Sequence, residues 1–227
     1  DLPEVPDATF IAVNAESAID IIADLKSIGG GGAVLYASGF GEVGEKGIKR
    51  NQRLLEAADG MPVIGPNCYG FINSLDRVAL WPDVHGCEAV SSGVAIITQS
   101  GNIGLNITMQ SIGLPIAYMF TLGNQTNTNI ADIIHAMLDD NRVSAIGLHI
   151  EGISDIKSFE IAAQRAINKK IPIVAIKSGR TDASAKIALS HTSSMTGSDQ
   201  LFSVFFERLG IARVNTVPEF LETLKLL

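Results

Sequence analysis

Short apolar runs rich in β-branched residues alternate with longer amphipathic segments along most of the chain. The apolar runs predict β-strands at 8–13, 33–37, 62–64, 94–98, 116–121, 145–150 and 171–176. The longer segments place apolar residues three or four positions apart and predict helices at 15–27, 46–58, 103–112, 130–139, 156–169 and 199–209. Strands that alternate with helices indicate βαβ units, and therefore an α/β protein built on parallel sheets.

The alternation lapses between residues 76 and 92, where turn-forming residues gather. We place a domain boundary there, which divides the chain into 1–87 and 88–227. The second part has four predicted strands in strict alternation with helices, enough for a flavodoxin-like domain. The first part has three, with 71–73 as a fourth, which is too few for a complete doubly wound sheet.

The chain of 227 residues carries a net charge of −7 at pH 7, so we expect no nucleic-acid partner, because non-specific binding needs clustered Lys and Arg. No window approaches the ~18 uninterrupted apolar residues of a membrane span, and we expect a soluble protein with no membrane partner. Phosphate-bearing ligands remain compatible with an acidic chain, since backbone amides bind them without net positive charge.

The two cysteines, Cys68 and Cys87, lack the spacing of metal ligands, and we expect no metal site in this chain. Low cysteine content without a signal peptide predicts a reducing, cytoplasmic location, with a Cys68–Cys87 disulfide as the alternative. The sequence starts at Asp1 without Met and ends inside a predicted helix at 218–227, so we expect a fragment of something longer.

Ligands of open parallel sheets bind at the carboxyl ends of strands, beside helix N-termini. The loop that follows strand 94–98 fits this description. Its small residues allow the backbone at Ser100, Gly101 and Asn102 to approach an anion, which the helix dipole also favours. The same residues suit an ordinary N-cap, so the loop alone leaves a phosphate site and a plain capped helix both open.

Glu151 follows strand 145–150 in the same kind of position. A carboxylate there can accept a hydrogen bond from a ring N–H of a histidine and leave the second ring nitrogen to attack phosphorus. The alternative is a solvated loop glutamate. His149, inside the strand, is interpreted as a core or interface histidine.

The segment that follows strand 171–176 is the most informative of the chain. It places His191 between Ser190 and Thr192 in a hydroxyl-rich stretch of small residues. A phosphoryl acceptor needs an unprotonated ring nitrogen and nearby donors. A lone loop histidine is usually a surface residue, and the flanking residues are what favour the acceptor. Arg180 suits a phosphate or a carboxylate equally well.

Six motifs resemble the ADP-forming acyl-CoA synthetases of the succinyl-CoA synthetase superfamily. They are G-P-N-C-Y-G (65–70), T-Q-S-G (98–101), L-G-N (122–124), I-E-G (150–152), K-S-G-R-T (177–181) and S-H-T (190–192). The likeness runs over nearly the whole chain. It implies that 1–87 is the C-terminal part of a Rossmann-like CoA-binding domain, and that 88–227 is a flavodoxin-like ligase domain carrying a phosphohistidine loop.

In that family, acyl-CoA, nucleoside diphosphate and phosphate interconvert with the free acid, CoA and nucleoside triphosphate. The resemblance implies that His191 carries the phosphoryl group and that Glu151 orients it. It assigns phosphate binding to Ser100, Gly101, Asn102, Ser190 and Thr192. It assigns CoA binding to Ala37, Ser38, Gly39, Pro66, Asn67 and Cys68.

The resemblance also implies a partner, because the ATP-grasp domain or subunit that binds Mg and ADP or ATP is absent from this sequence. Members of the family assemble from ligase and ATP-grasp parts, so the resemblance also implies an oligomeric assembly. The family's CoA-binding domain begins with a glycine-bearing βα unit that lies before Asp1, so CoA binding by the fragment itself stays open. The loop 125–129 reads Q-T-N-T-N where relatives carry aspartates, which is expected to remove negative charge near the acyl end.

Two other classes compete with the ligase. Similar modules, fused to an acetyltransferase domain, sense CoA or nucleotides without ligase turnover. Such a module would tolerate loss of the histidine, so His191 with Glu151 favours the enzyme. A flavin-binding flavodoxin is disfavoured, because flavin sites place aromatic rings against the cofactor and the candidate loops are nearly devoid of Trp and Tyr.

Overall fold

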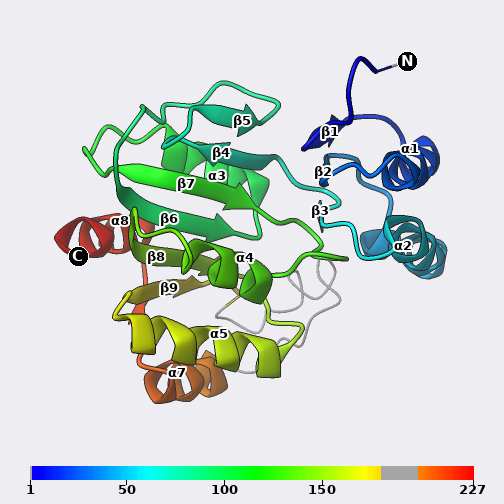
Figure 1. The fold of residues 1–227 in the computed structure, drawn as a ribbon. Coiled ribbons are helices and arrows are strands. Elements are labelled where there is room, and N and C mark those ends of the chain that lie inside the picture. Colours follow the sequence, from blue (N-terminus) through cyan, green and yellow to red (C-terminus); the bar gives the residue numbers. More distant parts are fainter. Residues whose placement is uncertain (1, 180–198) are drawn as a thin grey trace.

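The computed structural model describes residues 2–179 and 199–227. Within them the chain forms two sheets (Figure 1). The small sheet has three parallel strands in the order β1-β2-β3: β1 (Thr9–Ile11), β2 (Ala33–Leu35) and β3 (Val63–Ile64). Helices α1 (Ala15–Ser27) and α2 (Glu45–Ala58) pack together on the side of this sheet that faces away from the rest of the molecule.

Local sequence explains where α1 begins and which face it buries. The side chain of Asn14 accepts hydrogen bonds from the amides of Glu16 and Ser17, both at 3.1 Å, and so caps the helix. Ile22 and Leu25 lie on one face, three residues apart, and are buried in the small core. Full burial of a side chain such as Ile22 contributes roughly 1.5–3 kcal/mol.

The large sheet has the strand order β10-β9-β8-β6-β7-β4-β5. Its strands are β4 (Gly70–Asn73), β5 (Val78–Leu80), β6 (Gly93–Thr98), β7 (Ile116–Thr121), β8 (Val143–Ile150), β9 (Ile173–Lys177) and β10 (Ala212–Val214). The strands from β10 to β7 are parallel, whereas β4 pairs antiparallel with β7 and with β5. The central strands are buried along both faces, which explains their continuous apolar runs.

Helices cover both faces of the large sheet (Figure 1). On one face, α4 (Ile130–Met137), α5 (Ile156–Lys169) and α7 (Asp199–Arg208) share one hydrophobic core. On the other, α3 (Gly101–Thr108) and α8 (Val217–Leu226) share a second. This doubly wound arrangement confirms the predicted α/β class, and within the described residues the predicted strands and helices are present with small shifts of their ends.

The predicted strand at 71–73 is present, but it does not join the three strands of the small sheet. Those residues belong to β4, which pairs with β7, and the neighbouring β5 was not predicted. The signal was weak because β5 is short and largely exposed. The sheets therefore divide between β3 and β4, while a domain boundary near residue 88 stays a prediction.

The loop after β7 joins the two sheets. Its backbone runs along the free edge of β3, where Asn124 N–H donates to Pro66 O at 2.9 Å and Thr126 N–H donates to Gly65 O at 3.1 Å. The side-chain oxygen of Asn127 accepts the amide of Val63 at 2.8 Å. These bonds pair an edge strand that would otherwise be open and fix the small sheet beside the large one. Among the described helices, none has the length and apolar character needed to span a membrane.

Candidate functional site

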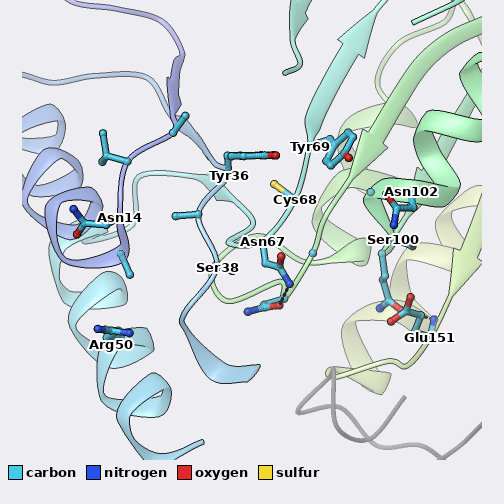
Figure 2. Close-up of a pocket in the computed structure, with 18 of the residues that line it drawn as sticks. Asn14, Tyr36, Ser38, Arg50, Asn67, Cys68, Tyr69, Ser100, Asn102 and Glu151 are labelled. Carbon is cyan, nitrogen blue, oxygen red and sulfur yellow. Dashed lines mark hydrogen bonds between the residues drawn. The ribbon is translucent and has the colours of Figure 1, made fainter. Parts of the chain in front are cut away.

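A cavity of about 1030 Å³ lies between the two sheets, where the carboxyl ends of their strands face one another (Figure 2). One wall comes from the small sheet and includes Asn14, Ser38 and Arg50. The opposite wall comes from the large sheet and includes Ser100 and Glu151. Of the described site residues predicted from sequence, those that line the cavity are Ala37, Ser38, Asn67, Cys68, Ser100, Gly101, Asn102 and Glu151.

The start of α3 offers backbone donors to the cavity. Ser100 is the N-cap, and its hydroxyl accepts the amide of Ile103 at 3.3 Å. Gly101 and Asn102 occupy the first turn, where amides have no acceptor within a helix. A side chain at position 101 would place its Cβ 2.8 Å from the ring of Tyr69, so glycine allows this close packing. The arrangement suits an anion at the positive end of the helix.

Glu151 directly follows β8, is half-buried and lines the cavity. Its backbone is held by Gln99, a residue that sequence reasoning missed. The Gln99 side-chain oxygen accepts the amides of Glu151 and of Gly152, the latter at 2.9 Å, and its nitrogen donates to Gly152 O at 2.5 Å. Gln99 is only 5% exposed. The signal available in the sequence was a polar residue placed directly after the apolar run of a buried strand.

The G-P-N-C turn brings Asn67 and Cys68 to the floor of the cavity. Asn67 adopts a left-handed conformation with φ of 60°, and its amide donates to Ala37 O at 2.9 Å. Cys68 is buried, and burial raises the pKa of its thiol to about 12. The thiol is therefore protonated at neutral pH, which disfavours a nucleophilic role. Cys68 and Cys87 are both free thiols, so the disulfide alternative is wrong.

Two residues predicted to bind CoA lie behind the cavity surface. The amide of Gly39 donates to the carboxylate of Glu42 at 2.5 Å, and its carbonyl accepts Arg50 at 2.7 Å. Pro66 is buried, and its carbonyl accepts the amide of Asn124. Neither residue lines the cavity, so both shape the loops that do.

Glu42 connects the small-sheet wall to the loop after β7. Burial opposes its ionisation, but hydrogen bonds from the amides of Gly39 and Phe40 and from the side chain of Asn124 outweigh this effect and lower the pKa of Glu42. A carboxylate held in this way is charged at neutral pH and accepts hydrogen bonds from both walls.

The amide-rich loop 125–129 has structural roles that account for its residues. Asn129 caps α4, Asn127 accepts the amide of Val63, and the side chain of Gln125 accepts the amide of Ile130 at 3.0 Å. From this stretch of the chain, Gly123 and Asn124 line the cavity, whereas 125–129 do not. An effect of these amides on the charge at the acyl end stays a prediction.

The remaining predicted residues, Arg180, Ser190, His191 and Thr192, lie outside the described residues. Ser178 and Gly179, which precede them, line the cavity and were not predicted to. His149 is 3% exposed, in line with its interpretation as a core residue. In the described part of the chain, no three His, Cys, Asp or Glu side chains are grouped so that they could hold a metal ion.

Comparison with known proteins decides the family. A profile of succinyl-CoA ligase like flavodoxin domains matches residues 91–227. The chain belongs to this family. The match covers the large sheet from β6 onward and includes Ser100, Glu151 and His191. The family therefore accounts for one wall of the cavity.

Curated relatives extend the likeness to the small sheet. The alpha subunit of the ADP-forming acetate–CoA ligase II of Pyrococcus furiosus is 32% identical over 226 residues, which are 97% of this chain and 48% of that protein. A trans-feruloyl-CoA synthase of an unknown prokaryotic organism is 30% identical over 226 residues, 96% of this chain and 32% of that protein. The chain thus spans about half, or less, of the length of these relatives.

A solved structure agrees with this likeness. The acetyl-coenzyme A synthetase 1 of Candidatus Korarchaeum cryptofilum, in complex with phosphate and ADP, is similar with a TM-score of 0.86 and 29% identity. The match covers 98% of this chain and 48% of that one. It therefore includes both the small sheet and the large sheet. An ATP citrate lyase of Methanothrix soehngenii, at 16% identity and a TM-score of 0.74, shares the fold.

Proposed function

We propose that this chain is the CoA- and phosphate-handling part of an NDP-forming acid–CoA ligase, with His191 as its phosphoryl carrier. One observation carries the proposal: a single cavity gathers the loops predicted to bind CoA and the loops predicted to bind phosphate. A thioester held on one wall and a phosphate held on the other would meet there. The names of the relatives, an ADP-forming acetate–CoA ligase and a trans-feruloyl-CoA synthase, support the same reaction class.

The proposed reaction proceeds in three transfers. An oxygen of phosphate attacks the thioester carbon, the C–S bond breaks, and CoA leaves as an acyl phosphate forms. An unprotonated ring nitrogen of His191 then attacks phosphorus, and the bond from phosphorus to the acyl oxygen breaks to release the carboxylate. A terminal oxygen of a nucleoside diphosphate finally takes the phosphoryl group from the histidine and gives the triphosphate. The reverse sequence makes acyl-CoA at the expense of the triphosphate.

The large-sheet wall supplies the groups that the phosphoryl transfers require. Backbone amides at the start of α3, with Ser100 as N-cap, would stabilise the phosphoryl oxygens. Glu151 would accept the ring N–H of His191 and keep the other nitrogen free to attack. Ser190 and Thr192 would add hydroxyl donors. The neutral thiol of Cys68, on the floor of the cavity, takes no covalent part.

The small-sheet wall would hold CoA. Ala37, Ser38, Asn67 and Cys68 line the cavity and would contact the nucleotide and thiol end, while Gly39 and Pro66 support their loops. Both relatives carry this wall within the matched region, and both are named as enzymes of CoA esters.

The whole activity would need an ATP-grasp domain or subunit that binds Mg with ADP or ATP. Support comes from length, since the chain spans about half of an alpha subunit and a third of a longer synthase. We further propose an oligomeric assembly in the cytoplasm.

The acid substrate differs among the relatives. One is named for acetate and the other for trans-feruloyl-CoA, so candidate acids are to be tested by experiment.

The test is the mass of the complete protein, with its ATP-grasp part, after incubation with Mg-ATP. We expect a gain of one phosphoryl group that is acid-labile, base-stable and absent from His191→Asn. The matched control is His135→Asn, a half-buried helical histidine, which should still be phosphorylated. A preparation that binds nucleotide but gains no phosphoryl group would overturn the proposal.

A further inference from the structure

A row of side-chain hydrogen bonds crosses the carboxyl ends of β6, β8 and β9. The hydroxyl of Thr98 accepts the amide of Ser100 at 3.0 Å and lies 3.0 Å from Nδ1 of His149. On the other side of the ring, Nε2 of His149 lies 2.7 Å from the hydroxyl of Ser178. The row thus links the cap of α3 to Ser178, and both of these ends line the cavity.

The imidazole in the middle of this row is neutral. His149 is buried, and burial, with a contribution from the charge of Lys177, lowers its pKa to about 4. A neutral imidazole has one N–H, so one ring nitrogen must donate and the other must accept. The hydrogen bonds of the row therefore run in one direction or the other.

The geometry at Thr98 indicates that direction. Its hydroxyl already accepts the Ser100 amide, and its own hydrogen has two acceptors within reach, His149 Nδ1 at 3.0 Å and Ser100 O at 3.2 Å. The ring nitrogen is the nearer. If Thr98 donates to Nδ1, then Nε2 carries the proton and donates to Ser178 Oγ.

A Ser178 hydroxyl that accepts from His149 keeps its own hydrogen for another acceptor. The backbone of Ser178 is fixed, because its amide donates to Ile150 O at 2.9 Å and its carbonyl accepts the Lys177 ammonium. Ser178 lines the cavity together with Ser100 and Glu151. Within the described part of the chain, the Ser178 hydroxyl has no hydrogen-bond partner besides His149, so its hydrogen can point to a ligand in that cavity.

We propose that Ser178 is an anion-binding residue that donates a hydrogen bond to a phosphate or phosphoryl oxygen, and that His149 is the positioning residue that orients it. The inference rests on the proposed function, since it needs an anion in the cavity. Ser178 would add a side-chain donor to the backbone donors of α3. In the sheet, β8 lies between β6 and β9, so Glu151 lies between Ser100 on one side and Ser178 on the other. The reverse direction of the row would leave Ser178 without a hydrogen for the ligand.

The test is nitrogen NMR of the complete protein with labelled histidine, titrated with inorganic phosphate. We expect the signal of His149 to show a proton on Nε2 and to shift as phosphate binds. We expect Ser178→Ala to weaken phosphate binding about tenfold, the loss typical of one hydrogen bond to a charged group.

A pair of variants separates orientation from mere packing. Glutamine can place an amide N–H near the position of Nε2, whereas the shorter asparagine reaches that of Nδ1. His149→Gln should therefore keep phosphate binding within about twofold of the wild type, and His149→Asn should resemble Ser178→Ala. A purely structural histidine would make the two variants alike, and that result would overturn the inference.

The same titration distinguishes the two proposals. If the amides of Gly101 and Asn102 shift with phosphate while the His149 ring does not, the further inference fails and the proposed function stands. A proton on Nδ1, or unchanged phosphate binding by Ser178→Ala, also overturns it. If no amide of the cavity responds to phosphate, the proposed function fails and this inference fails with it.

Discussion

The side chain of Gln99 holds the backbone of Glu151: its Oε1 accepts the Glu151 amide and, at 2.9 Å, the next amide along the chain. The turn that presents the carboxylate to the cavity is therefore attached to the end of β6 as well as to its own strand, β8. Gln99 is buried, so water does not replace these bonds when they are removed.

Removal of the Gln99 amide should destabilise the protein. Gln99→Leu leaves the buried amide and carbonyl of Gly152 and the half-buried amide of Glu151 without their partner, and we expect a loss of about 2–4 kcal/mol in the free energy of unfolding. Urea denaturation measures it. Gln110→Leu is the matched control, because Gln110 is exposed on α3's C-terminal side and should change stability by about 0.5 kcal/mol or less. Equal losses in the two variants would contradict the role of Gln99.

Replacement of the Glu151 carboxylate should slow phosphorylation without unfolding the protein. Glu151→Gln keeps the backbone held by Gln99 but weakens the acceptor that we propose for the ring N–H of His191. We expect the rate of phosphorylation by Mg-ATP to fall about 100-fold or more, followed by rapid quench. Glu222→Gln, on the exposed side of α8, should leave the rate unchanged. A rate within twofold of the wild type for Glu151→Gln would exclude an orienting role.

Buried His149 predicts a specific dependence of stability on pH. Burial lowers its pKa from 6.5 to about 4 in the folded protein, so the unfolded chain binds a proton in this window that the folded protein excludes. The neutral, buried His149 therefore makes its full contribution to the free energy of unfolding above pH 6.5. As the pH falls from 6.5 through about 4, the protein loses roughly 3 kcal/mol of this free energy in total.

Urea denaturation at a series of pH values measures this slope, and the His149→Gln variant supplies the comparison. That variant has no group at position 149 to titrate, so its stability should vary less between pH 6.5 and 4.5. Parallel curves for the two proteins would show that His149 is not buried in its neutral form.

The thiol of Cys68 should be unreactive at neutral pH. Its pKa of about 12 leaves little thiolate, so alkylation by iodoacetamide at pH 7.5 should be at least roughly 1000-fold slower than that of a free cysteine. Peptide mapping over time measures the rate. Cys68→Ala should retain ligase turnover within a few-fold, whereas a covalent nucleophile at this position would lose all of it.

The sequence predicted the elements better than their assembly. Long apolar runs such as 116–121 specify buried strands by themselves, and the N-cap at Asn14 specifies where α1 begins. The pairing of β4 with β7 was not predicted, because it depends on residues about fifty positions away. A short exposed strand carries little local signal about its partner.

The candidate site shows the same division. Residues at the ends of strands, such as Ser100 and Glu151, were found because parallel sheets gather ligands there. Gln99 and Ser178 were missed because their importance depends on which buried groups they contact, Glu151 in one case and His149 in the other. Local sequence did not distinguish Gly39 and Pro66, which shape the loops, from Ser38 and Asn67, which line the cavity.

The central claim is that one cavity passes a phosphoryl group between CoA chemistry and His191. The most direct test is to isolate the complete protein phosphorylated by labelled ATP, remove the nucleotide, and add candidate acids with and without CoA. We predict that the label leaves as inorganic phosphate, with acyl-CoA formed in equal amount, when both the acid and CoA are present. Release that needs neither, or a phosphoprotein that no acid with CoA discharges, would contradict the claim and favour a regulatory module.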